Sequence, residues 1–131
     1  MKKVRVKHIT RNIDPADAQD LLERVPRACL AFSGDDGPYA LPIAFVWHDG
    51  RYFAGIPEEA NLPPAIDQEV VLLIDEGVQF FDLRAIYIRG RVKPSEAPRD
   101  APTGSAWLEV IPLKTVAWDY GTLREASDAD R

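Results

Sequence analysis

The stretch YALPIAFVWHDGRYFAGIP, residues 39–57, carries the clearest pattern of a strand pair in this chain. In its first half every second residue is bulky and apolar, namely Tyr39, Leu41, Ile43, Phe45 and Trp47. The residues between them are small or short: Ala40, Pro42, Ala44 and Val46. A period of two indicates a strand with one core-facing side. Asp49-Gly50 is a typical two-residue hairpin turn, so RYFAGI (51–56) is expected to return as a paired antiparallel strand.

Further strand-like segments lie on both sides of this hairpin. They are ACLAFS (28–33), EVVLLID (69–75), GVQFFDLRAIYIRGRVK (77–93) and AWLEVIPLKTVAWDY (106–120). The 77–93 segment is too long for one regular strand, and its bulky positions change parity near residues 82–84, where we expect a bulge or bend. Six strands joined largely by short turns predict a mainly β fold, a small antiparallel barrel.

One short helix is expected ahead of the strands, over residues 14–25. Asp14 and Pro15 form a typical helix start. The apolar residues that follow fall on one helical face: Ala18, Leu21, Leu22 and Val25. A second short helix is also possible. Residues 94–105 contain three prolines and predict an exposed loop, and the polar tail 121–131 is expected to fray.

Composition limits the function classes. With 131 residues and 46% hydrophobic content, the chain 1–131 is expected to form a single domain. A net charge of −5 without a basic cluster argues against binding to nucleic acid or to an anionic membrane surface. No apolar stretch approaches the roughly 20 residues of a membrane span, so we expect a cytoplasmic protein. Neither a metal site nor a catalytic constellation is predicted, because Cys29 is alone and the histidines are isolated.

The order of these segments resembles the pyridoxamine 5'-phosphate oxidase-like, flavin-binding split β-barrel family. The resemblance covers roughly residues 14–120 and rests most specifically on the strand with Pro42 and its WHDG hairpin, and on FDLRAIYIRG (81–90). It implies a six-stranded antiparallel split β-barrel that forms a homodimer. It also implies flavin mononucleotide (FMN), or a deazaflavin, in a groove at the subunit interface. Redox chemistry would then come from the cofactor and not from a catalytic side chain.

The resemblance also implies which residues lie near the cofactor. They are Pro42, Ile43, Ala44, Gly55, Ile56, Pro57, Ala60, Asn61, Leu62, Arg84 and Trp107. Pro42 to Ala44 and Gly55 to Pro57 would form a flat shelf for the isoalloxazine ring, with small residues leaving room for it. The same small residues are also compatible with tight packing at a barrel seam. Arg84 could reach an anionic ligand, or it could belong to a solvated or interface face.

PEEANLPP (57–64) departs from the family pattern. Relatives typically hold the flavin phosphate at a helix start with a Ser-Arg-Lys sequence, whereas this chain has Ala60-Asn61-Leu62 after two glutamates. Like charges repel, so Glu58 and Glu59 disfavour a phosphate there. Two functions therefore remain open. One is a flavin- or deazaflavin-dependent oxidoreductase acting on a small substrate. The alternative is a cofactor-free dimeric split barrel with a degenerate phosphate site and a binding or regulatory role.

Overall fold

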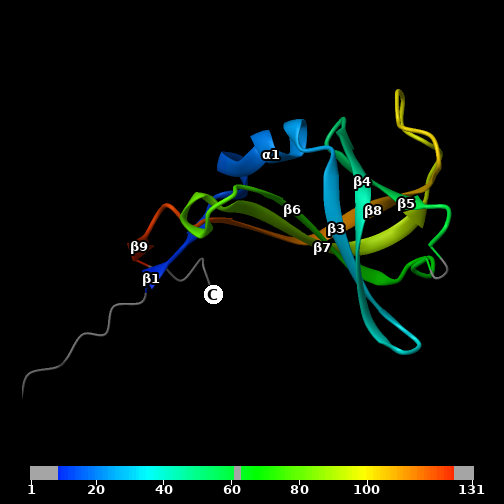
Figure 1. The fold of residues 1–131 in the computed structure, drawn as a ribbon, viewed down its shortest axis with the longest axis horizontal. Helices are drawn as coiled ribbons and strands as arrows, with labels where there is room; N and C mark the ends of the chain where they lie inside the picture. The colour runs from blue at the N-terminus through cyan, green and yellow to red at the C-terminus, as the bar shows by residue number, and fades with distance from the viewer. Residues whose placement is uncertain (1–8, 61–62, 126–131) are drawn as a thin grey trace, which may run out of the picture.

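The computed structural model describes residues 9–60 and 63–125, and it is mainly β (Figure 1). Six antiparallel strands form the barrel: β3 (Arg27–Gly34), β4 (Gly37–His48), β5 (Arg51–Pro57), β6 (Glu69–Glu76), β7 (Arg84–Pro94) and β8 (Ser105–Asp119). Their order is β8-β5-β4-β3-β6-β7, and the pairing of β7 with β8 closes the barrel. The predicted fold class, a six-stranded antiparallel split β-barrel with one or two short helices, is confirmed.

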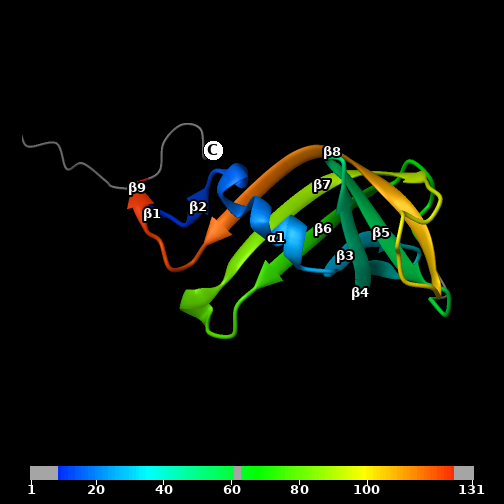
Figure 2. The ribbon, with the colours of Figure 1, turned by 90° about the horizontal axis from the view of Figure 1, so that it is seen from above.

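The predicted helix is present but begins as a tighter turn. Residues Pro15–Ala18 form the 3-10 helix η1, and Gln19–Arg24 form α1. Asp14 caps the start, because its side chain accepts a hydrogen bond of 3.0 Å from the backbone N–H of Ala16. Leu21 and Leu22 of α1 are buried against the barrel, so the helix lies along one side of the sheet (Figure 2). Within the described residues, no helix has the length and apolar character needed to cross a membrane.

One continuous core fills the barrel and extends under α1. It includes the following apolar residues of α1, β3, β4 and β6: Leu21, Leu22, Leu30, Phe32, Phe45, Leu72 and Ile74. On β4, Ile43 and Phe45 are buried, while the residues between and beside them are exposed or half-buried. The bulky side of the hairpin therefore faces inward, as the alternation predicted.

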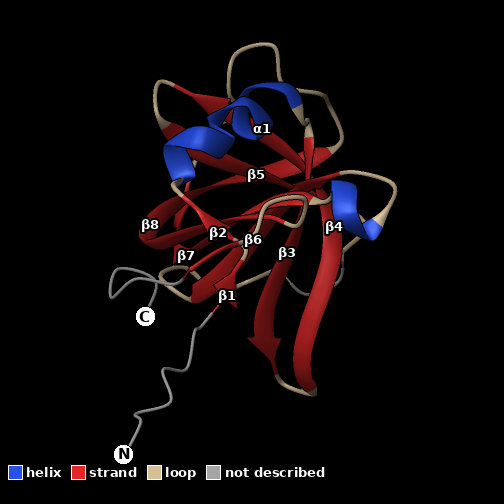
Figure 3. Cartoon of the chain, turned by 90° about the vertical axis from the view of Figure 1, so that its left-hand side faces the viewer, coloured by secondary structure: helices blue, strands red, loops and turns tan. Residues whose placement is uncertain are grey.

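The β3–β4 hairpin extends beyond the other strands (Figure 3). β4 pairs with β5 only from Ala44 to His48, and β3 pairs with β6 only from Cys29 to Ala31. The outer edge of β4 before Ala44 therefore has no strand partner among the described residues. Pro38 and Pro42 lie on this part of β4. Proline has no N–H to offer, so these residues make the free edge a poor template for pairing with another strand.

The structure corrects two boundary predictions. Residues 77–83 are not part of a strand: the 3-10 helix η2 (Phe80–Asp82) follows a turn at Gly77, and β7 begins at Arg84. The bend predicted near residues 82–84 is present, because η2 ends there and β7 begins. The apolar side chains before it are exposed, and Val78 is 95% exposed.

The chain ends also differ from expectation. The short strand β9 (Arg124–Glu125) lies inside the tail that was expected to fray and pairs with β1 (Ile9–Thr10). A further short strand, β2 (Asn12–Ile13), adds to β8 next to the barrel. Two-residue strands are too short to show any periodicity in the sequence. β2 pairs with the end of β8, and β9 follows β8 in the chain, so both pairings depend on the position of β8. Residues 126–131 lie outside the described residues.

Candidate functional site

The candidate ring shelf lies on the outer side of β4 and β5. Ile43 and Ile56 point into the core and are 4% and 3% exposed, so only their backbone could contact a ligand. Pro42 and Ala44 alternate with Ile43 and therefore face outward, where Pro42 is exposed and Ala44 is half-buried. Pro57 is half-buried on the neighbouring strand. The outward part of the predicted shelf thus consists of Pro42, Ala44 and Pro57.

Trp107 takes the space that was expected to be open over Gly55. These two residues are opposite each other in the β5–β8 pair. A Cβ atom placed on Gly55 would lie 2.8 Å from Cη2 and Cζ2 of the indole, so the glycine is needed for this contact. Trp107 is 6% exposed. Because Gly55 also pairs with Ala44, the indole borders the shelf on its β8 side.

The turn after β5 offers no helix for a phosphate. Ala60 donates its backbone N–H to the carbonyl of Pro57 at 2.9 Å, which closes a tight turn, and Glu58 donates to the carbonyl of Gly104 at 3.2 Å. The side chains of Glu58 and Glu59 are exposed. In residues 58–60 and 63–68 the structure contains turns and no helix. The predicted positions Asn61 and Leu62 lie outside the described residues.

Arg84 is already engaged in an ion-pair network and does not face the shelf. Its guanidinium donates to both carboxylate oxygens of Asp20 on α1, at 3.1 and 2.6 Å, and lies 3.6 Å from Glu76. Arg24 joins the same network through Asp20 at 2.8 Å and Glu76 at 2.6 Å. The hydrogen bonds from Arg84 and then Arg24 hold the pKa of the Asp20 carboxyl well below its usual range. The structural role of Arg84 is to fasten α1 to the sheet.

This network predicts a loss of stability in acid. Because the pKa of Asp20 is lowered in the fold, its contribution to stability is complete above the pKa of a free carboxyl, about 4, and is lost progressively as the pH falls from there toward the lower pKa of the folded state. We expect Asp20→Asn to be less stable than wild type at pH 7 by about 1 kcal/mol or less, since these side chains are 26% to 40% exposed. Urea midpoints at pH 7 and pH 3 measure the effect. The difference in urea midpoint between wild type and Asp20→Asn should be smaller at pH 3 than at pH 7. An unchanged difference would contradict the role assigned to Asp20.

An apolar row crosses the outer side of the barrel beside the shelf. Pairing places the following residues side by side on β4, β3, β6, β7 and β8: Pro42, Cys29, Leu73, Tyr87 and Val116. All of them except the exposed Pro42 are half-buried. The sequence indicates part of this row, because EVVLLID is apolar in both phases and a strand with two apolar faces is expected to be covered on both sides. The neighbours of Leu73 on the other strands follow only from the pairing register.

No family model matches the chain, and no curated protein matches it in sequence. Solved structures do match in fold. A FAD-binding protein from Mycobacterium smegmatis aligns over 84% of this chain and 96% of its own, with a TM-score of 0.64 and 19% identity. A FAD-binding protein from Mesorhizobium loti aligns over 93% and 100%, with a TM-score of 0.60 and 14% identity.

A candidate pyridoxamine 5'-phosphate oxidase from Corynebacterium glutamicum aligns over 83% of this chain and 90% of its own. Its TM-score is 0.60 and its identity to this chain is 12%. Each alignment covers more than four fifths of this chain, so the likeness concerns most of the domain. The chain therefore has the split β-barrel fold of the flavin-binding, pyridoxamine 5'-phosphate oxidase-like proteins.

Proposed function

We propose that this chain is a homodimeric flavin- or deazaflavin-binding oxidoreductase that acts on a small molecule. The observation that carries the proposal is the outward shelf of Pro42 and Ala44, bordered by the buried indole of Trp107. A planar ring needs a flat surface without projecting side chains, and proline and alanine provide one. The matching structures described as FAD-binding proteins support the same ligand class.

The two ends of a flavin fit this chain unequally. The ring end fits, because the outward residues of the shelf are apolar and short and Trp107 offers an aromatic edge beside them. The phosphate end does not fit the described residues, since the turn at 57–60 carries two exposed glutamates and Arg84 is held by Asp20. Any flavin is therefore expected to be held mainly through its ring.

A bound flavin would supply the hydride or electron transfer, as cofactors generally do. The side chains of this chain would position the ring: the shelf supports one face, and Trp107 limits its movement toward β8. The half-buried apolar row beside the shelf would exclude water once it is covered by a second subunit.

The second candidate is a cofactor-free dimer with a binding or regulatory role. It is favoured by the missing phosphate contacts and by the indole that fills the space over Gly55. The two candidates differ in a direct test. Purified protein should show flavin absorbance, or should quench the fluorescence of added riboflavin at micromolar concentrations, if the first is correct. Protein that is colourless and leaves riboflavin fluorescence unchanged favours the second.

The proposed homodimer gives a separate prediction. The outer apolar row crosses five strands, and contiguous apolar surface of this kind typically marks an interface. We expect sedimentation velocity at micromolar concentration to give twice the chain mass of 14.6 kDa. Leu73→Glu, which places a charge in the middle of the row, should give the monomer mass, whereas Val78→Glu at an exposed turn should not. If wild type is a monomer at micromolar concentration, the apolar row is not a dimer interface.

A further inference from the structure

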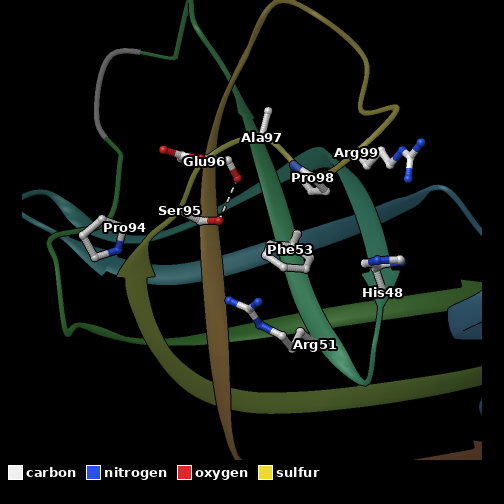
Figure 4. Close-up of a pocket in the computed structure, with 9 residues that line it drawn as sticks. All are labelled: His48, Arg51, Phe53, Pro94, Ser95, Glu96, Ala97, Pro98 and Arg99. Carbon is white, nitrogen blue, oxygen red and sulfur yellow. Dashed lines mark hydrogen bonds between the residues drawn. The ribbon is translucent and has the colours of Figure 1, made fainter.

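A separate hollow lies under the loop that joins β7 to β8 (Figure 4). Pro94 at the end of β7 and the loop residues up to Arg99 lie over the end of the β4–β5 hairpin and line an open hollow of about 410 Å³. Volumes of this size accommodate small organic molecules. On the other side of the hollow lie Phe53 and Arg51 of β5 and His48 of β4.

This hollow is distinct from the ring shelf. Along the outer side of β5, Phe53 precedes Gly55, and Trp107 lies over Gly55. None of the residues that line the hollow belongs to the ring shelf, and Trp107 is not among them. A ligand in the hollow would not compete with a ring on the shelf, and the inference does not depend on flavin binding.

Arg51 is held in a fixed orientation at this hollow. Its Nε donates to Glu109 at 2.9 Å, and its Nη2 donates to the second oxygen of the same carboxylate. Its guanidinium carbon lies 5.1 Å from the centroid of the Phe53 ring, a cation–π distance. Glu109 engages Nε and one N–H of Nη2, which leaves the two N–H groups of Nη1 and the second N–H of Nη2 as donors. A guanidinium braced in this way loses little side-chain entropy when a ligand binds.

Arg99 supplies a second positive charge at the hollow. It is exposed on the loop and has no hydrogen bond or ion pair with any described residue. Figure 4 shows Arg51 on one side of the Phe53 ring and His48 with Arg99 on the other. Ser95 donates its hydroxyl to the carbonyl of Glu96 at 2.8 Å. The Glu96 side chain points away from the Phe53 ring (Figure 4).

We propose that this hollow is a binding site for a small organic anion with a flat apolar body, of the aromatic carboxylate class. Arg51, through the N–H groups that Glu109 does not engage, and Arg99 would both donate to the carboxylate, and the Phe53 side chain would form part of the apolar wall. Guanidinium groups suit carboxylates because their planar N–H donors match the two oxygens.

The test compares benzoate with its neutral isostere benzamide. Each is titrated into the protein, and the backbone amide shifts of residues 48–53 and 95–101 are followed by NMR. We expect benzoate to shift these amides and to bind at least tenfold more tightly than benzamide. Arg99→Gln should weaken benzoate binding by about five- to tenfold, because it removes one charge-assisted contact. Lys114→Gln, an equal change of charge on an exposed part of β8, is the matched control and should have no effect.

Three results would overturn the proposal. One is equal binding of benzoate and benzamide, which would leave the cations without a role. Another is an equal effect of Arg99→Gln and Lys114→Gln on benzoate binding, which would mean that only the net charge of the protein attracts benzoate. The third is an absence of shifts in residues 48–53 and 95–101 at millimolar benzoate. Arg51→Lys separates charge from geometry, because it keeps the charge but loses the planar donors, and it should also weaken benzoate binding.

Discussion

Leu72→Ala is expected to lower the free energy of unfolding by about 2 to 5 kcal/mol, the usual cost of truncating a fully buried leucine. Leu72 is 0% exposed and lies in the middle of β6. It is opposite Leu30 on β3 and Ile88 on β7, and both of these are also fully buried. Three strands therefore enclose the cavity that the substitution leaves, and they have little freedom to collapse into it.

Urea denaturation followed by tryptophan fluorescence measures this loss. Val78→Ala is the matched control, because Val78 is 95% exposed and its truncation should change stability by less than about 0.5 kcal/mol. A Leu72→Ala variant that unfolds at the wild-type midpoint would contradict the position of β6 in the barrel. The expected loss is a large fraction of the 5 to 15 kcal/mol that typically stabilises a domain, so the variant should be studied at low temperature.

The barrel could be predicted from the sequence because its signals are local. The alternation in residues 39–48 fixes which side of β4 faces the core, and the Asp49-Gly50 turn fixes its partner. Asp14 and Pro15 mark the helix start for equally local reasons. The sequence assigns the exposed apolar segment before β7 to a strand, because periodicity does not tell a buried apolar residue from an exposed one.

The candidate site was less predictable because it depends on contacts between distant segments. Trp107 fills the space over Gly55 although 52 positions separate them in the sequence. Arg84 is engaged by Asp20, which lies on α1, and no local pattern connects the two residues. The hollow under residues 94–99 likewise exists only because the loop crosses back over the β4–β5 hairpin. Sequence patterns describe one element at a time, whereas these contacts depend on the packing of several.

The turn at PEEANLPP allows the flavin proposal to be tested where its support is weakest. If the turn faces a flavin phosphate, restoring cations by Asn61→Arg with Leu62→Lys should tighten FMN binding. Each well-aligned charge-assisted contact contributes about 1.5 to 3 kcal/mol, so one contact corresponds to roughly a tenfold gain or more. Both positions lie outside the described residues, and this expectation rests on their place in the sequence.

Riboflavin is the control for this prediction because it has the ring but not the phosphate. Wild type should bind both flavins weakly and with similar affinity, since the described residues favour the ring end alone. The Asn61→Arg, Leu62→Lys variant should gain affinity for FMN and leave riboflavin unchanged. Glu58→Gln with Glu59→Gln should act in the same direction, because it removes two exposed negative charges beside the turn. Equal gains for both flavins, or no binding of either, would mean that the turn does not face a phosphate, and the cofactor-free dimer would then be the better account of this chain.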